Sequence, residues 1–500
     1  MSEMNINEDN ISKRWFCTLA VLIILVGIAL RLPHFATRSL WFDEAVAANN
    51  TRGSLAETLR NTRTDNSCPI LYPLILFAVQ KVRSDPITVR LPALVSSVLL
   101  IILVVWMGRK IIPARAALVA ALLMALALSQ IRYAQEVREY AFASLTAGFM
   151  TYAYLDFLSC PSDRRKRLRL WGALALAPLI QYGLVLYGIA ILLALGWFAL
   201  SYRTIRWREI VVGFGVFVTT GLVSLFLTLR YQYQSSANPW YLEEYIFRFG
   251  QANPVKFLFK NTLSTLNFLG PGEIALGLVI LGLSLVVVMA PRTGTIKISR
   301  LLLCAGGVTI MAALGHVYPF GGIRQCLYLA PLIIIAVAVG LEDMSSRLDG
   351  GKGYRYIAVI TAILVVSGAK ELISRGAYAE VEDSQTILTQ LAEVATPMDE
   401  VYIYYSARPA VEFYMREEQH KHFIFGRSHR DHPDEYVREI QSAVNPNTTR
   451  LWLVFSHINF NEDLRIIKDM QATNFGWIVV ERLRATNAAL FEATRVSVPN

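Results

Sequence analysis

The chain has 500 residues, of which 54% are hydrophobic and only 17% are charged, and its mean hydropathy is +0.41. This balance excludes an assembly of soluble domains and indicates a membrane protein with many spanning helices. The net charge of +10 does not indicate a nucleic-acid partner, because most of the excess Lys and Arg falls in short loops between apolar segments.

The first apolar segment, Trp15–Leu32, follows Lys13 and Arg14. Its composition is also that of a signal peptide, but it has no small-residue cleavage site and it ends at Arg31. We therefore expect an uncleaved first span.

Apolar segments recur along the chain and predict about eleven spans. The candidates are Trp15–Leu32, Leu91–Met107, Ile111–Leu128, Tyr140–Leu158, Leu170–Ile180, Leu184–Leu200, Ile210–Leu229, Ile274–Ala290, Leu301–Leu314, Cys326–Leu341 and Ile357–Ala369. Pro69–Val82 is left out, because it is short and contains two prolines. If it crossed the membrane fully, the basic cluster Arg164–Arg167 would lie on the opposite side from the other basic loops. As an interfacial or re-entrant helix, it leaves all the basic loops on the side of the N-terminal tail.

The opposite face then receives the loop Pro33–Arg90, the loop Ser129–Glu139, the turn His316–Gln325 and the chain after Lys370. From about Gly376 the composition becomes that of a soluble domain. Helical spacing of apolar residues predicts a helix over Glu380–Ala395 and another over Pro409–Met415, and short strands are predicted at Val401–Tyr405, Leu451–Phe455 and Trp477–Val480. The sequence thus predicts an α-helical polytopic membrane domain over residues 1–375 and a small extracytoplasmic α/β domain over residues 376–500.

Two adjacent carboxylates, Asp43 and Glu44, follow the first span within Ser39-Leu-Trp-Phe-Asp-Glu-Ala. Beside two aromatic residues at the membrane boundary, either carboxylate could serve as a general base. On composition alone, a solvated acidic loop or the first turn of an amphipathic helix is the better explanation of the pair, because paired acids are common in loops and carboxylates favour helix N-termini.

A second group of polar residues, Arg132 to Tyr140, precedes the fourth span and includes Gln135, Glu136, Arg138 and Glu139. Its acids, amide and arginines are dense enough to indicate a site, and the arginines could meet a membrane-borne phosphate. Arginines that reach from a span end towards water are the alternative interpretation.

The third candidate is the turn His316–Gln325, in which Gly321 and Gly322 permit close backbone approach and Arg324 could bind an anion. His316 and Tyr318 could contact a substrate there, although a lone interfacial His is more often structural. The chain has no H-E-x-x-H, Walker or G-x-G-x-x-G pattern, so zinc proteolysis and nucleotide hydrolysis lack support.

Four motifs in register resemble the membrane glycosyltransferases of the GT-C fold. They are Ser39-Leu-Trp-Phe-Asp-Glu-Ala, Pro69-Ile-Leu-Tyr72, Arg90-Leu-Pro-Ala and Ala-Gln135-Glu136-x-Arg138-x-Tyr140-Ala. The resembling branch contains bacterial undecaprenyl-phosphate-sugar transferases, lipid A aminoarabinose transferases and protein O-mannosyltransferases. The chain departs from that branch at Cys68, where relatives often have His, Asn or Lys, and at Ile70, where they usually have Pro.

The resemblance implies the roles of several residues. Asp43, with Glu44 beside it, would be the catalytic base, Glu136 a second acidic residue of the site, and Arg138 a contact for the donor phosphate. Arg324 and Arg90 are further candidates for the phosphate, and the candidates for substrate binding are Tyr72, Gln135, Tyr140, His316 and Tyr318. A divalent cation at Asp43 and Glu136 is left open, because carboxylates suit hard cations.

The expected function is transfer of a sugar from a polyprenyl-phosphate donor to a hydroxyl of a glycan, lipid or protein acceptor. The expected location is the bacterial inner membrane, with the reaction on the extracytoplasmic face among membrane lipids. A transporter or lipid flippase without glycosyl transfer is the alternative. A transporter favours ionisable groups near the bilayer midplane and repeated halves, and the sequence shows neither.

Overall fold

The computed structural model describes most of the chain. It covers residues 12–64, 68–202, 205–235, 244–248, 250, 253–269, 295–347, 352–374, 378–429, 432, 434–472 and 476–495. Contacts divide the chain into two compact units. The membrane unit comprises Met1–Phe35, Leu59–Ala78 and Arg90–Tyr378, and the C-terminal unit comprises Ala36–Thr58, Val79–Val89 and Ala379–Asn500.

The membrane unit is helical. Its long helices are α1 (Lys13–Ala29), α5 (Pro86–Met107), α6 (Ala114–Leu126), α8 (Tyr140–Ser159), α9 (Arg164–Ile180), α10 (Tyr182–Tyr202), α11 (Trp207–Ser224), α13 (Pro254–Leu269), α15 (Ile296–Leu314), α16 (Ala330–Ser345) and α17 (Lys352–Ser374). Its shorter helices are α3 (Leu55–Thr64), α4 (Leu71–Gln80), α7 (Leu128–Tyr133), η2 (Leu225–Leu229), α12 (Arg230–Ser235) and η4 (Arg324–Leu329). Among the described residues of this unit, five segments are long and apolar enough to cross a membrane, by length and composition: Pro86–Met107, Tyr182–Tyr202, Trp207–Gln232, Ile296–Leu314 and Arg324–Ser345.

The predicted spans agree with these helices. Each candidate span coincides with a helix except Ile274–Ala290, which lies outside the described residues. The expectation of an α-helical polytopic membrane protein is therefore confirmed. The segment Pro69–Val82 forms α4, a helix of 10 residues. At about 1.5 Å per residue such a helix is far shorter than a hydrocarbon core of about 30 Å, so it cannot cross fully, as predicted.

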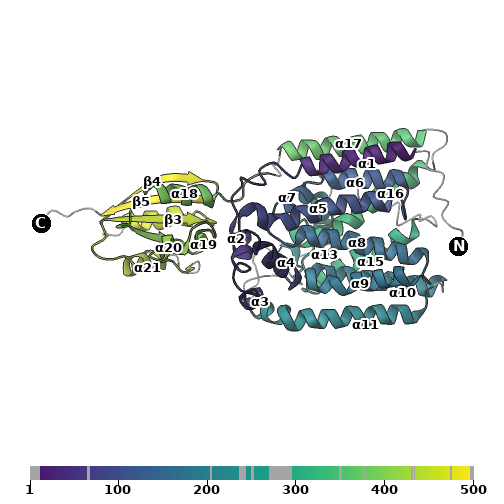
Figure 1. The fold of residues 1–500 in the computed structure, drawn as a ribbon, viewed down its shortest axis with the longest axis horizontal. Helices are drawn as coiled ribbons and strands as arrows, with labels where there is room; N and C mark the ends of the chain where they lie inside the picture. Colours follow the sequence, from purple (N-terminus) through teal and green to yellow (C-terminus); the bar gives the residue numbers. More distant parts are fainter. Residues whose placement is uncertain are drawn as a thin grey trace. The chain divides into compact units, whose positions relative to one another are not determined.

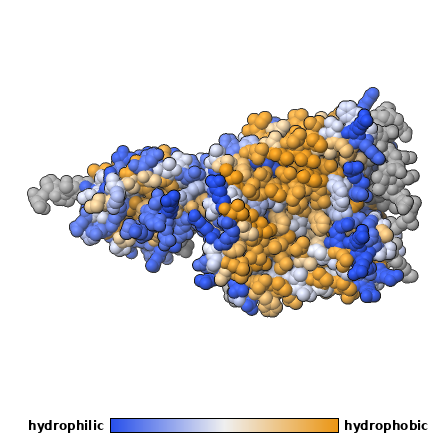
Figure 2. Space-filling view, in the orientation of Figure 1, coloured by the Kyte–Doolittle hydropathy of each residue, from blue (hydrophilic) through white to orange (hydrophobic). Residues whose placement is uncertain are grey.

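The long helices of the membrane unit alternate in direction. Helices α5, α8, α10 and α16 end at the end of the bundle where α1, α6, α9, α11, α15 and α17 begin (Figure 1). Figure 2 shows hydrophilic residues gathered along this end and a hydrophobic band over the middle of the bundle. The arrangement agrees with the predicted placement of the basic loops on the side of the N-terminal tail.

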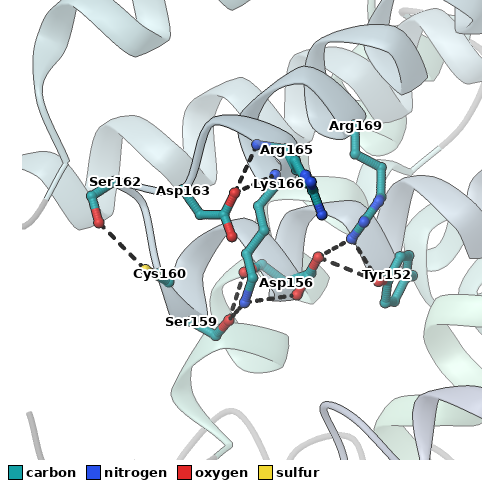
Figure 3. Close-up of polar contacts among 9 residues, drawn as sticks. All are labelled: Tyr152, Asp156, Ser159, Cys160, Ser162, Asp163, Arg165, Lys166 and Arg169. Atoms are coloured by element: carbon teal, nitrogen blue, oxygen red, sulfur yellow. Dashed lines mark hydrogen bonds and ion pairs between the residues drawn. The ribbon is translucent and has the colours of Figure 1, made fainter.

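One basic turn at this end is fixed by a carboxylate. Asp156 near the end of α8 is largely buried and binds Lys166 (Nζ to Oδ1, 3.0 Å) and the Arg169 guanidinium, both from α9 (Figure 3). Asp163 caps α9 by accepting the backbone N–H of Arg165 at 2.7 Å. The cluster Arg164–Arg167 therefore forms the first turn of α9.

The C-terminal unit contains a five-stranded sheet in the order β2-β1-β3-β5-β4. The strands are β1 (Glu400–Ile403), β2 (Ile424–Phe425), β3 (Arg450–Ser456), β4 (Trp477–Ala485) and β5 (Ala488–Arg495). Strands β2, β1 and β3 are parallel, and β5 and β4 add an antiparallel hairpin. The remaining elements of this unit are α2 (Phe42–Asn49), α18 (Ser384–Val394), η5 (Tyr405–Ala407), α19 (Arg408–Tyr414), α20 (Glu417–His420), α21 (Glu435–Ala443) and α22 (Glu462–Ala472).

Helices cover both faces of this sheet. Apolar residues of α18 and α19 pack on one face, against Val401 and Trp452 among others. Apolar residues of α21 and α22 pack on the other face, against Leu451 and Phe455. The small α/β domain is thus confirmed, with β2 and β5 as strands that the sequence did not predict.

Replacing Asp156 by Ala should lower the unfolding free energy by about 1–3 kcal/mol, because two partly exposed cations lose a buried partner. The matched control is Glu244→Ala, which removes an exposed pair (Glu244 Oε2 to Lys260 Nζ, 3.2 Å) and should change stability by less than about 0.5 kcal/mol. Thermal unfolding in detergent measures both, and equal losses in the two variants would contradict the anchoring role of Asp156.

Candidate active site

The side chain of Gln135 holds the chain that leaves the first span. Gln135 is fully buried, and its Nε2 donates to the carbonyl oxygens of Arg31 (2.9 Å) and Pro33 (2.8 Å). These carbonyls follow the last turn of α1 and have no helical partner of their own. The Arg132–Tyr140 motif therefore lies at the C-terminal end of α1, away from the basic turns of the bundle.

Two buried arginines fix the same region. The guanidinium of Arg31 donates to Ser97 Oγ (2.8 Å) and to the carbonyl oxygens of Met124 and Ala125 (both 3.1 Å), which joins α1 to α5 and to the end of α6. Arg90, also fully buried, donates to the carbonyl oxygen of Phe35 at 3.2 Å. Arg90 was predicted as a phosphate ligand, and the structure shows its guanidinium bound to the backbone that follows α1.

Two other predicted arginines meet at one aromatic ring. The guanidinium carbons of Arg138 and Arg324 lie 5.8 Å and 5.6 Å from the ring centroid of Tyr140. Arg138 precedes α8 directly, whereas Arg324 begins η4, so the fold joins residues that are far apart in sequence. Each cation lies within the range of a favourable cation–π interaction, so one ring holds two arginines.

An acidic residue belongs to the same cluster. Glu136 is almost fully buried, and its Oε1 lies 3.3 Å from Nε of Arg132, whose side chain is partly exposed. Arg138 pairs in turn with Glu139, Nε to Oε2, at 3.6 Å. The four charges alternate in sign along the chain, so each buried carboxylate has a cation beside it.

Tyr133 lies among the predicted residues and interacts with several of them. Its ring makes an edge contact with Tyr140, with centroids 5.4 Å apart. Burial raises the pKa of the Tyr133 hydroxyl and the charge of Glu136 raises it further, while the nearby cations Arg132 and Arg324 lower it. Sequence reasoning did not single out Tyr133. Its spacing from Tyr140 would place the two on one face of a continuous helix, but the chain leaves the helix between α7 and α8, so only the fold brings the rings together.

Arg324 owes its position to the two glycines that precede it. A Cβ at Gly322 would lie 2.4 Å from Ser264 Oγ and 2.7 Å from the Ser264 carbonyl oxygen, and a Cβ at Gly321 would lie 2.2 Å from the Tyr245 ring. The Gly322 N–H also donates to Ser264 Oγ at 3.1 Å. The close backbone approach predicted from the Gly-Gly pair is confirmed, and its partner is α13.

The other predicted residues of this unit take different places. Tyr72 is buried in the first turn of α4. Tyr318 donates to the carbonyl oxygen of Gln325 at 3.1 Å, and His316 is exposed with a positive φ of 59°.

Cys68 stands where relatives often carry His, Asn or Lys. Burial and the charge of Glu139 raise the pKa of the Cys68 thiol, and the charge of Arg138 opposes them, so Cys68 lies near Arg138 and Glu139.

Asp43 and Glu44 belong to the C-terminal unit. Both lie in the first turn of α2, which agrees with the helix N-terminus considered from the sequence. Glu44 is fully buried, and its Oε2 accepts the backbone N–H of Trp41 at 3.4 Å. Asp43 is only partly buried. Glu44 therefore caps its own helix, and Asp43 is the more accessible carboxylate of the pair.

Within the part of the chain that the structure describes, no three His, Cys, Asp or Glu side chains gather as metal ligands. Glu136 in the membrane unit has an arginine as its partner.

The chain combines many membrane helices with a small α/β domain, and a buried group of acidic and basic residues lies at the C-terminal end of α1. Solved structures with the same fold are known. ArnT from Cupriavidus metallidurans bound to undecaprenyl phosphate matches with a TM-score of 0.57 at 14% identity, over 96% of this chain and 98% of that chain. The apo state of the same protein gives a TM-score of 0.58.

A second group of matches is archaeal. The oligosaccharyltransferase AglB from Archaeoglobus fulgidus, in complex with an inhibitory peptide and a dolichol-phosphate, gives a TM-score of 0.52 at 12% identity, over 88% of this chain and 69% of that chain. No family model and no curated protein matches the sequence. The chain therefore has the GT-C fold of membrane glycosyltransferases, as the four motifs implied, and at these identities the likeness establishes the fold alone.

Replacing Gly322 by Ala should lower the unfolding free energy by about 1–3 kcal/mol, because the new methyl group meets a backbone oxygen that cannot rotate away. The control is Gly307→Ala in α15, where a Cβ meets no atom within 4 Å and helix propensity favours Ala by about 0.5–1 kcal/mol. Thermal unfolding of both variants in detergent tests the steric role. A Gly322→Ala variant as stable as the control would show that α13 and η4 do not require the glycine.

Proposed function

We propose that this protein transfers a sugar from a polyprenyl-phosphate donor to a hydroxyl of an acceptor on the extracytoplasmic face of the membrane. The observation that supports this most directly is the convergence of Arg138 and Arg324 on Tyr140 at the C-terminal end of α1. Such a transferase must accommodate a lipid phosphate at the membrane surface, and arginine suits a phosphate because its planar guanidinium can bind two oxygens at once. The GT-C fold adds support, since the matched structures include one bound to undecaprenyl phosphate and one in complex with a dolichol-phosphate.

In this proposal Arg138 and Arg324 bind the donor phosphate and stabilise the charge that develops on it as the sugar leaves. Arg90 is a weaker candidate for the phosphate, since its guanidinium already binds the carbonyl oxygen of Phe35. Tyr140 orients both arginines through its ring. Glu136 orients sugar hydroxyls, and its pairing with Arg132 holds its side chain in place.

Asp43 is the proposed base. It is the accessible member of its pair, while Glu44 is occupied in capping α2. Because no helix crosses the membrane between Phe35 and Phe42, Asp43 emerges on the same side as the C-terminal end of α1, where Gln135 places Glu136 and Arg138. The two acid-bearing segments would then face one aqueous compartment.

The proposed reaction is a single displacement at the anomeric carbon. The acceptor oxygen forms a bond to that carbon while the bond to the phosphate oxygen breaks, and the polyprenyl phosphate leaves with the electron pair. Asp43 takes the proton of the acceptor hydroxyl. The leaving group is already anionic, so the chemistry chiefly needs the base and the positive charge.

The remaining candidates are proposed to bind the substrates next to the arginines and Glu136. Tyr72 and Gln135 lie on the elements that surround it, with Gln135 holding the backbone after α1. Tyr318 and His316 precede Arg324 in the same turn, and either could contact the sugar or the acceptor. The C-terminal α/β domain lies on the extracytoplasmic side.

Replacing Asp43 by Asn should reduce transferase activity by about a hundredfold to ten-thousandfold without loss of folding, because the isosteric amide cannot take the proton. The assay supplies purified protein with a labelled polyprenyl-phosphate sugar and measures release of free polyprenyl phosphate. Glu57→Gln, an exposed carboxylate on the same loop, is the control and should retain activity. Near-wild-type turnover by Asp43→Asn would remove Asp43 from the role, and unchanged lipid with the wild-type protein would favour a transporter or flippase.

Replacing Arg324 or Arg138 by Ala should raise the KM for the donor by about tenfold to a hundredfold, because each removes one charge-assisted contact to the phosphate. Lys should restore part of the affinity, since it keeps the charge but not the planar fork. Arg109→Ala, an exposed cation at the opposite end of the bundle, serves as the control. Donor KM values that are equal in all these variants would exclude the arginine pair as the phosphate site.

A further inference from the structure

The sheet of the C-terminal unit has a switch point between β1 and β3. These parallel neighbours are followed by helices on opposite faces, since α19 follows β1 and α22 follows β3. In open α/β sheets, ligands bind outside the carboxyl ends of the strands at such a point. Here β3 ends at Ser456, and the next residue, His457, has a positive φ of 53°, an uncommon backbone conformation for a residue other than glycine.

The loop that follows α1 packs against the carboxyl end of β3. The ring of Phe42 stacks on His457 with centroids 4.8 Å apart and an interplanar angle of 23°, and Trp41 lies 6.2 Å from the same ring. Asn49, at the end of α2, donates through Nδ2 to the carbonyl oxygen of Pro409 at 2.8 Å. Helix α2 is thus docked at both of its ends, and Asp43 is the residue directly after Phe42.

A fully buried carboxylate lies at the centre of this contact. Glu382 accepts the backbone N–H of Phe42 at 3.2 Å, and it also accepts the hydroxyls of Ser384 and Ser456. Its Oε2 lies 3.2 Å from Nδ1 of His457. A charge without access to water needs this number of partners, and four converge here from three separate segments.

The neighbouring amides of the loop are bound in the same way. The Ser39 N–H donates to Glu380 Oε1 at 3.0 Å, and the Leu40 N–H donates to the Tyr414 hydroxyl oxygen at 2.6 Å. In the opposite direction, the Gln385 N–H donates to Ser39 Oγ at 3.1 Å. Side chains therefore accept each backbone N–H from Ser39 to Phe42, the Trp41 N–H being bound by Glu44. Amides that precede and open a helix would otherwise require water, and three of their four acceptors are carboxylates, which suit the positive end of α2.

We infer that the α/β domain is a positioning device for Asp43, with Glu382 as its central positioning residue. At the switch point, where other open α/β sheets bind a ligand, this sheet binds Trp41 and Phe42 of its own chain. Glu382 accepts the backbone N–H of Phe42, the residue before Asp43. This inference rests on the proposed function for its catalytic consequence. The docking of residues 39–45 stands on the contacts alone.

The test compares Glu382→Gln with Asp399→Asn in the full-length protein. Asp399 is also a buried carboxylate of this domain, but it precedes β1 and binds Arg450 (Oδ1 to Nε, 2.7 Å) and Trp452. Hydrogen exchange of the backbone amides of residues 39–45 should be about tenfold faster in Glu382→Gln, because the neutral amide is a weaker acceptor. In Asp399→Asn it should match the wild type.

The kinetic readout uses the donor-turnover assay. In Glu382→Gln, kcat should fall about tenfold to a hundredfold with the donor KM unchanged, as expected when a base is displaced while the phosphate site is intact. Tyr414→Phe, which removes the hydroxyl that accepts the Leu40 N–H, should produce a smaller change of the same kind and serves if Glu382→Gln does not fold.

Unchanged exchange at residues 39–45 in both Glu382→Gln and Tyr414→Phe would overturn the docking, and faster exchange with an unchanged kcat would overturn the positioning role. A wild-type protein that leaves the donor intact would instead refute the proposed function. In that case the exchange measurement still decides whether the domain holds the loop.

Discussion

The structure of the candidate site depends on the hydrogen bonds from Gln135 to the carbonyls of Arg31 and Pro33. Inside a membrane protein, the unpaired carbonyls at a helix end are costly unless a side chain satisfies them. Here the buried amide comes from the same short segment that carries Glu136 and Arg138. The end of the first span and the charged cluster are therefore held in a single geometry, and displacement of one would expose polar groups of the other.

Other buried charged groups of the membrane unit each bind a partner that fixes their position. Arg31 and Arg90 bind backbone carbonyls, Glu136 pairs with Arg132, and Asp156 at the other end of the bundle pairs with cations of α9. Arg138 pairs with Glu139, and Arg138 and Arg324 also share the ring of Tyr140, which brings two cations from distant parts of the chain to one place.

The C-terminal unit uses the same principle at its sheet edge. Glu382 is buried at the switch point and is stabilised by contacts with the loop that precedes Asp43. Because a buried carboxylate without partners is strongly unfavourable, docking of the loop and folding of the domain reinforce each other. A small domain whose role was not evident from its composition thereby acquires a structural connection to the first loop.

The sequence by itself determined the class of protein and most of its elements, because apolar segments of spanning length and the distribution of Lys and Arg are constrained locally by the bilayer. It also predicted the α/β domain through α18, α19, β1, β3 and β4, but missed β2, which is very short, and β5. The four motifs indicated the fold, and the Gly-Gly pair indicated the close approach that α13 provides.

Only the tertiary structure decided which charged residues act together. Arg324 follows Arg138 by almost two hundred residues along the printed sequence, and no local pattern predicts that both would meet Tyr140. Likewise, Glu44 and Asp43 are equivalent in sequence, and only the cap of α2 distinguishes the buried carboxylate from the accessible one. Local periodicity determines which residues face a core, whereas hydrogen bonds between distant segments depend on how the helices and strands pack, and that is where the candidate site is formed.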